Sequence, residues 1–226
     1  MESGCYGAET DIQRTKDGRY IINHDNTFER LTGNSSTPQD LTLEEIKQLR
    51  ARDPRFPDME MEIPTLEEVL GASRGRIKLF IEFKGATADH QMVDDAVRIV
   101  REHDAVDDVV FISLSYDCIA HAKETYPEFE YGLLFFAQYG DVSLLKCDIL
   151  LAEEEMTTNS FVSRAHDASR EVGAWTVNTE EDLSKVLQGQ ADYIITDTVA
   201  LAHDVQTQLD GRTNLEVITD MIWGSR

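Results

Sequence analysis

Several features that would assign this chain to a particular class of protein are missing from its sequence. No apolar run reaches the roughly 20 residues that a membrane-spanning helix requires. The first residues show no basic segment followed by an apolar one, so no signal peptide is expected. The three cysteines (Cys5, Cys118 and Cys147) are odd in number and have no CxxC spacing. We therefore expect a protein without disulfide bonds, and its location, cytoplasmic or membrane-associated, stays open.

Positive charge is also scarce. The chain contains 21 Lys and Arg against 43 Asp and Glu, so its formal net charge is −22. A strongly acidic protein repels nucleic acid and anionic membrane surfaces, so neither is expected as a main partner. An enzyme with this charge that acts on an anionic phosphodiester needs a local cation, which a bound metal ion and a lysine can supply.

Short apolar runs alternate with amphipathic segments along most of the chain. Residues 89–103, for example, place their apolar side chains on one helical face. Strands that alternate with helices predict an α/β protein with a parallel sheet and right-handed crossovers. A closed (β/α) barrel of the TIM type has eight such strands, and seven are predicted here, so the pattern indicates a TIM-type barrel that lacks one strand. The predicted strands are 8–13, 77–83, 109–113, 131–136, 148–151, 174–177 and 193–196.

A hairpin and an insertion interrupt this pattern near the N-terminus. Lys16-Asp17-Gly18 lies between the runs at 8–13 and 20–23, and Asp-Gly predicts a tight turn between two antiparallel strands. Residues 26–62 are rich in Asn, Ser, Pro and Asp. We interpret them as an insertion after this second strand.

The C-terminal residues 210–226 are predicted to form a helix, because Leu215, Ile218 and Ile222 recur at helical spacing. No linker-like segment divides the chain. Residues 1–226 are therefore expected to form a single barrel domain.

Carboxylates gather where the predicted strands end. Glu9 and Asp11 are two residues apart, so both side chains point to the same side of a strand. Glu82 closes the next parallel strand, and the chemistry of α/β barrels lies at such strand ends. Buried carboxylates repel one another unless a cation lies between them. The pattern indicates a site for one divalent cation, Mg²⁺ or Ca²⁺ with Mn²⁺ also compatible, although solvated strand-end carboxylates produce the same pattern.

Two further side chains near these carboxylates can carry chemistry. His24 follows the run at 20–23 and can transfer a proton to or from a reacting group, although a lone histidine is often structural. Lys84 shares a strand face with Glu82. It can bind a phosphoryl oxygen and stabilise charge in a transition state, or form an ion pair with a neighbouring carboxylate.

Three residues near the ends of later strands have weaker signals. Trp175 can form an apolar wall for the carbon atoms of a substrate, or pack in the core. Asn178 and Asp197 fall at strand–helix junctions, where both residue types commonly cap helices, and capping is the expected role of each.

Several short segments are far more specific as an ordered set than any one of them is alone. They are Gly7-Ala8-Glu9-Thr10-Asp11, Asn23-His24-Asp25, Ile63-Pro64-Thr65-Leu66-Glu67-Glu68, Glu82-Phe83-Lys84, Ser115-Tyr116, Trp175-Thr176-Val177-Asn178 and Ile194-Ile195-Thr196-Asp197. In this order they resemble the glycerophosphodiester phosphodiesterase family of TIM-barrel enzymes. The likeness runs from about residue 4 to about residue 205.

The resemblance implies metal-dependent hydrolysis of a small-molecule glycerophosphodiester to sn-glycerol 3-phosphate and an alcohol. It implies that Glu9, Asp11 and Glu82 are metal ligands and that His24 is catalytic. Lys84 is expected to act in catalysis by contacting the phosphate, and Trp175 to contact the substrate.

One departure from the family concerns its beginning, where a strand ends in His-Arg-Gly and a helix follows. Neither has a counterpart in this sequence, and that first histidine is one of two that are catalytic in the family. We therefore expect a metal site with weak activity or none. A missing first strand would leave a parallel edge unpaired, and association into a homodimer is one consequence. Some relatives carry a membrane domain upstream, which this chain could also have in a longer protein.

Two alternative functions stay open from the sequence. One is a lyase-type phosphodiesterase, in which a hydroxyl of the substrate attacks phosphorus and a cyclic phosphate results. The other is a non-catalytic domain that binds glycerophosphodiesters or interacts with another protein.

Overall fold

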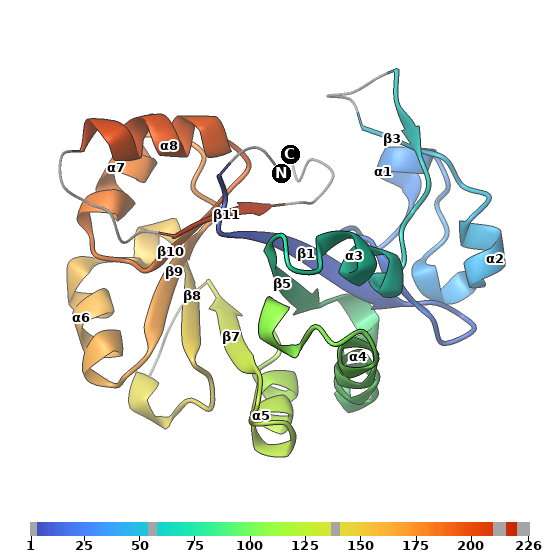
Figure 1. Ribbon diagram of the computed structural model, residues 1–226, viewed down its shortest axis with the longest axis horizontal. Coiled ribbons are helices and arrows are strands. Elements are labelled where there is room, and N and C mark those ends of the chain that lie inside the picture. The colour runs from blue at the N-terminus through green and yellow to red at the C-terminus, as the bar shows by residue number, and fades with distance from the viewer. Residues whose placement is uncertain (1–3, 54–57, 137–140, 210–215, 221–226) are drawn as a thin grey trace.

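A curled parallel sheet with helices on its outer side forms the body of the molecule (Figure 1). The computed structural model describes residues 4–53, 58–136, 141–209 and 216–220. The parallel strands are β1 (Gly7–Arg14), β5 (Lys78–Phe83), β6 (Val109–Ser113), β7 (Glu130–Phe135), β8 (Ile149–Glu153), β9 (Glu171–Trp175), β10 (Tyr193–Thr196) and β11 (Glu216–Asp220). The predicted α/β barrel is confirmed.

Helices follow most of these strands and cover the sheet from outside. They are α3 (Leu66–Ser73), α4 (His90–Glu102), α5 (Tyr116–Thr125), α6 (Asn159–Asp167), α7 (Glu180–Gln188) and α8 (Val199–Gln208). Single turns of 3-10 helix lie in the connections at η2 (Gly85–Thr87), η3 (Val106–Asp108), η4 (Val142–Leu144) and η5 (Glu154–Met156). The apolar face expected for 89–103 is buried in α4. Among the described residues, no helix combines the length and the apolar character that crossing a membrane requires.

The C-terminal strand β11 closes the sheet into a ring. It pairs in parallel with β10 on one side, where Ile195 lies opposite Ile218, and with β1 on the other, where Gly7 lies opposite Ile218. The expected unpaired position beside the last strand is therefore occupied. The helix predicted for 210–226 is wrong at Glu216–Asp220, and the rest of that range lies outside the described residues.

The physical reason for this correction is a choice between two ways of pairing the backbone. Val217, Ile218 and Thr219 are β-branched and favour extended structure. Without β11, the facing edges of β10 and β1 would both have unpaired backbone N–H and C=O groups. β11 lies between these two strands and pairs with each of them. The spacing of apolar residues along the sequence reflects neither the preference of β-branched residues for strands nor the presence of two strands to pair with.

The interior of the ring is filled with apolar side chains. Along each strand, alternate residues point inward, as Ile149 and Leu151 do in β8. A Cβ atom at Gly173 would lie 2.5 Å from Leu151 Cδ2, so only glycine at this position leaves room for the leucine. The inward-facing cluster comprises Phe80, Val110, Ile112, Leu134, Ile149, Leu151, Tyr193 and Ile195. The barrel is therefore a packed core.

The hairpin predicted around Asp17-Gly18 is confirmed. β2 (Tyr20–Ile22) runs antiparallel to β1, and Gly18 has a φ of +77°, which glycine adopts without strain. β11 and β2 pair with the same edge of β1. β11 pairs with its first residues, Gly7 to Glu9, and β2 pairs with its last residues, Ile12 to Arg14.

Residues 26–62 contain several short elements around a small core that they share with Ile21 of β2 and with Ile63. These are α1 (Glu29–Thr32), η1 (Pro38–Asp40), α2 (Leu43–Ile46), β3 (Ala51–Arg52) and β4 (Glu60–Met61). Their core contains Ile21, Phe28, Ile46, Ala51 and Ile63. The interpretation of the chain as one domain with this insertion stays a prediction.

Candidate active site

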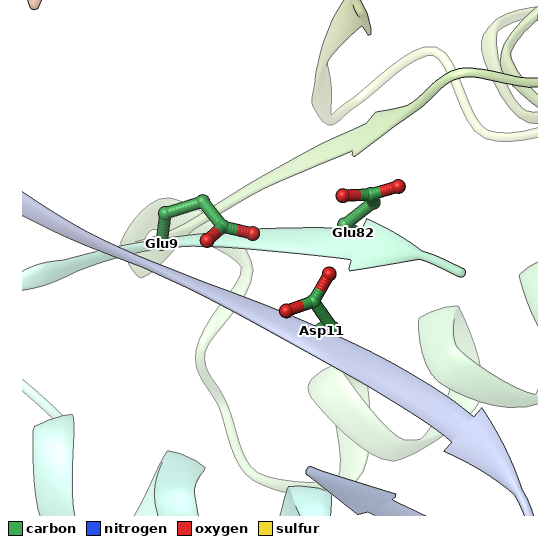
Figure 2. A group of neighbouring side chains, drawn as sticks. All are labelled: Glu9, Asp11 and Glu82. Atoms are coloured by element: carbon green, nitrogen blue, oxygen red, sulfur yellow. The ribbon is translucent and has the colours of Figure 1, made fainter. Parts of the chain in front are cut away.

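Three carboxylates meet at one wall of the barrel. Glu9 and Asp11 project from β1, and Glu82 projects toward them from β5 (Figure 2). The parallel register places Asp11 directly opposite Glu82. Asp11 is fully buried, and Glu9 and Glu82 retain 5% and 7% of their exposure. One oxygen from each residue lies within 4.8 Å of the others, a spacing at which three acceptors can share one cation.

Lys84 adds a positive charge at the edge of this group. Its Nζ lies 2.7 Å from Asp11 Oδ1 and 3.7 Å from Glu82 Oε2. Burial by itself lowers the pKa of Lys84, but the negative charges of Asp11 and Glu82 outweigh it and raise the pKa above its ordinary value. Lys84 is thus a permanent cation that offsets one of three negative charges.

Lys84 offsets only part of the negative charge that the three carboxylates can carry. Burial, with a smaller contribution from the charge of Glu82, raises the pKa of Asp11 to about 7 despite the nearby lysine. Among the described residues, Asp11 Oδ2 accepts no hydrogen bond although it is buried. A divalent cation would satisfy this oxygen and offset the charge, and an all-oxygen donor set suits Mg²⁺, Ca²⁺ or Mn²⁺. The residues present therefore fit a metal ion.

His24 lies in the loop after β2. The side-chain amide of Gln13 donates hydrogen bonds to the carbonyl oxygens of Asn23 (2.7 Å) and Asp25 (2.8 Å), which anchors the loop on both sides of His24. His24 Nδ1 lies 2.8 Å from Asp25 Oδ1. A carboxylate can only accept, so Nδ1 carries the proton, and Nε2 is the nitrogen left to exchange a proton with a substrate. Sequence reasoning missed Gln13, although its place two residues after Asp11 on the same strand face was a usable signal.

A cavity of about 340 Å³ opens at the carboxyl ends of the strands and brings these residues together. One side is polar and contains Glu9, Glu82, Lys84 and His24. The other side is mostly apolar, and its residues come from β6, β7, β9 and β10 or the positions just after them. It comprises Ile112, Leu114, Leu134, Phe136, Trp175 and Ile195, with Thr176, Asn178 and Asp197 beside them.

Trp175 lies in this cavity, as the substrate-contact prediction requires, and its indole is held in place. Nε1 donates a hydrogen bond of 2.8 Å to the carbonyl oxygen of Leu151, and the ring meets that of Phe136 edge to face at 4.9 Å. Leu114 and Phe136 keep 47% and 57% of their exposure at the mouth. The sequence contained no signal for them, because a single apolar residue after a strand is indistinguishable from core.

The capping role expected for Asn178 and Asp197 is wrong. The helices that follow begin at Thr179 and Thr198 as N-caps, and the side chain of Thr179 accepts the capping hydrogen bond in α7. Asn178 Nδ2 donates to Asp197 Oδ2 (2.7 Å), and Asn178 Oδ1 accepts from the Asp197 backbone amide (2.9 Å). The two residues therefore join the β9 and β10 loops at the cavity. The polar group nearest in space, not the nearest helix end, determined their partners.

The other histidines lie on helices outside the ring. His90 pairs with Asp117, His121 with Asp94 and His166 with Asp192. His103 and His203 lie at the end of α4 and within α8. Of the histidines in the described part of the chain, His24 alone lines the cavity.

Comparison with known proteins agrees with this geometry. A sequence model described as "Glycerophosphoryl diester phosphodiesterase family" matches residues 1–201. The chain belongs to that family. A glycerophosphodiester phosphodiesterase of Caldanaerobacter subterraneus subsp. tengcongensis is 29% identical over 208 residues, which are 87% of this chain and 84% of the relative.

Solved structures of the glycerophosphodiester phosphodiesterase family share the fold. A phosphodiesterase from Oleispira antarctica, determined in complex with the product sn-glycerol-3-phosphate, superposes with a TM-score of 0.80 at 24% identity and covers 93% of this chain and 87% of its own. A glycerophosphodiester phosphodiesterase from Agrobacterium tumefaciens superposes with a TM-score of 0.75 at 21% identity, over 91% and 88%. The resemblance read from the ordered sequence segments is confirmed.

Proposed function

We propose that this chain hydrolyses small glycerophosphodiesters to sn-glycerol 3-phosphate and an alcohol with the help of one divalent cation. The observation that carries the proposal is the buried group of Glu9, Asp11 and Glu82, placed beside Lys84 on one wall of a barrel cavity. The family and the product bound to the Oleispira antarctica relative support the substrate class.

Glu9, Asp11 and Glu82 are the residues that would hold the cation, and Asp11 Oδ2 is an acceptor in need of one. A bound Mg²⁺ or Ca²⁺ would neutralise phosphate oxygens and make phosphorus more open to attack. Lys84 lies next to the carboxylates and would contact another non-bridging phosphate oxygen, where its charge stabilises the pentacoordinate transition state.

Hydrolysis joins a water oxygen to phosphorus, breaks the bond from phosphorus to the alcohol oxygen, and moves one proton from the water to the departing alkoxide. His24 lines the cavity and would carry out one of these proton transfers through Nε2, while Asp25 keeps Nδ1 protonated and the ring oriented. Gln13 holds the loop that presents the ring.

Among the described residues, His24 is the one histidine that lines this cavity, so no second histidine of this part of the chain serves the other proton transfer. The ring position beside β1 is taken by β11, and residues 216–220 include no histidine. Loss of one of two general acid–base groups typically lowers the rate roughly 10²–10⁴-fold. We therefore expect slow hydrolysis, and the same observation favours the second candidate function, a domain that binds glycerophosphodiesters without turning them over.

The test is hydrolysis of glycerophosphocholine with Mg²⁺ or Ca²⁺, by the chain and by a Glu9→Gln variant, with calorimetric titration of the metal into both. Slow, metal-dependent release of sn-glycerol 3-phosphate that the variant lacks is the expected result. Metal and substrate binding without turnover would assign the binding function, and a cyclic phosphate product would assign a lyase. The proposal fails if the chain binds no divalent cation through Glu9.

A further inference from the structure

The proposed chemistry uses only one side of the cavity. The carboxylates, Lys84 and His24 lie on or beside β1 and β5, whereas the opposite side is built from β6, β7, β9 and β10. In a glycerophosphodiester, the phosphate joins glycerol to a second alcohol. In the proposed function, this phosphate lies beside Glu9, Asp11 and Glu82. The opposite side is therefore available to one of the two alcohol portions of the substrate, and its chemistry decides which alcohol fits.

Phe136 and Trp175 form an aromatic corner on that side. Their ring centroids are 4.9 Å apart and their planes are inclined by 65°, so the two rings present differently oriented surfaces to the cavity. The hydrogen bond from Trp175 Nε1 to Leu151 prevents the indole from turning away. Aromatic faces carry partial negative charge and attract cations, most strongly when the cation is poorly hydrated.

Asp197 supplies a full negative charge next to this corner. It follows β10, the strand beside β9, and lines the same cavity. Oδ2 accepts the hydrogen bond from Asn178, but Oδ1 is buried and accepts none from the described residues. No ion pair found within the described ranges involves Asp197, and Lys84, which also lines the cavity, is paired with Asp11.

The charges of the two sides differ once the site is filled. A divalent cation together with Lys84 offsets the three carboxylates of the polar side, so the phosphate of a substrate would meet no excess negative charge there. Within the described part of the chain, Asp197 on the apolar side has no ion-pair partner. A ligand that carries a positive charge at its alcohol end complements both sides of the cavity.

We propose that the apolar side of the cavity, comprising Leu114, Phe136, Trp175 and Asp197, selects substrates whose alcohol carries a quaternary ammonium group, such as choline. This inference rests on the proposed function. A primary ammonium has three N–H groups; Asp197 can accept from one of them, but Leu114, Phe136 and Trp175 cannot replace the hydrogen bonds to water that the others would lose. A trimethylated ammonium has no N–H to satisfy, packs against apolar walls and still attracts Asp197 and the aromatic faces.

Binding can be tested without turnover. The chain has two tryptophans, so a Trp223→Phe background leaves Trp175 as the single fluorescent reporter. Titration with choline is compared with 3,3-dimethylbutan-1-ol, which has the same shape without the charge. We expect choline to bind about tenfold more tightly than the neutral isostere. Equal affinities, or no response of Trp175 to either probe, would overturn the proposal.

Two variants assign the effect to the residues proposed. Asp197→Asn keeps an acceptor for Asn178 and removes the charge, and Phe136→Leu keeps apolar volume and removes the aromatic face. Each is expected to reduce the preference for choline by at least threefold. Asp204→Asn, an exposed position on α8, is the matched control and should change nothing. Equal preference in all four proteins, each checked for folding by circular dichroism, would refute the assignment.

The same comparison in turnover separates this inference from the proposed function. The ratio of kcat/KM for glycerophosphocholine to that for the glycerophosphodiester of 3,3-dimethylbutan-1-ol should be about ten and should fall in Asp197→Asn. Turnover of both diesters at equal efficiency would support the proposed function and overturn the selectivity. Selective choline binding without turnover would do the reverse.

Discussion

Replacing Asp11 by asparagine is expected to change how the stability of the metal-free protein depends on pH. In the folded chain the pKa of Asp11 rises from its ordinary 3.8 to about 7, chiefly because the carboxyl is buried. A pKa difference between folded and unfolded states contributes about 1.4 kcal/mol per pH unit. As the pH rises from about 4 to about 7, the free energy of unfolding of the wild type, relative to that of Asp11→Asn, should therefore decline by up to roughly 4 kcal/mol.

The direction of the effect follows from proton binding. Between pH values of about 4 and 7 the folded state keeps a proton on Asp11 that the unfolded state has released. Raising the pH in this range therefore favours unfolding of the wild type. The stabilising contribution is complete below the unfolded pKa and is lost as the pH rises through the folded pKa. Asparagine has no proton to lose, so the variant lacks this contribution.

A divalent cation should reverse the effect, because it takes the place of the proton. At a concentration of one hundred times its Kd, it would stabilise the wild type by about 2.7 kcal/mol. Asp11→Asn should gain much less, since it lacks one of three carboxylates that lie within 4.8 Å of one another.

The assay is urea unfolding at several pH values from 4.5 to about 8, with a chelator and then with CaCl₂, for wild type, Asp11→Asn and the exposed-site control Asp204→Asn. Subtracting the variant from the wild type cancels the titration of shared groups that do not interact with Asp11, whereas Glu82, Lys84 and His24 do interact with it. A difference that does not change with pH in the chelator would refute the burial argument. Equal stabilisation of wild type and Asp11→Asn by Ca²⁺ would refute the metal site.

Four shorter predictions follow from the same geometry. His24→Ala should lower kcat/KM roughly 10²–10⁴-fold and leave calorimetric metal affinity unchanged; a parallel loss of metal affinity would contradict a proton-transfer role. Gln13→Ala should lower the free energy of unfolding by about 1–3 kcal/mol, because two loop carbonyls lose their donor; unchanged urea unfolding would speak against this anchor. Gly173→Ala should destabilise by about 1–3 kcal/mol, since the new Cβ meets Leu151; a neutral result in thermal unfolding would show that the leucine moves freely. Ile218→Pro should cost about 1–3 kcal/mol by removing a backbone donor from the ring, whereas Ile218→Val should be tolerated; equal melting temperatures of the two variants would mean that β11 is not needed to close the barrel.

The local sequence pattern was sufficient to predict the bounds of a strand wherever the segment is apolar, short and followed by a turn or a helix cap. The predicted runs at 109–113 and 193–196 coincide with β6 and β10. β9 begins three residues before the predicted start at 174, since Glu171 and Gly173 have low strand propensity but pair with β8 across the sheet. The sequence also predicted which carboxylates lie together, because residues two apart in a strand, such as Glu9 and Asp11, have their side chains on one face.

The sequence by itself determined that the chain alternates strands and helices, that Glu9 and Asp11 share one strand face and that Glu82 and Lys84 follow one another on the next strand, and that the chain resembles its family. Only the tertiary structure decided that residues 216–220 close the ring, that Gln13 anchors the His24 loop, and that Asp197 lines the cavity beside an aromatic corner. The physical reason is range. Periodicity and capping act between neighbours in the sequence, whereas strand pairing, burial and unpaired charge depend on residues that only folding brings together.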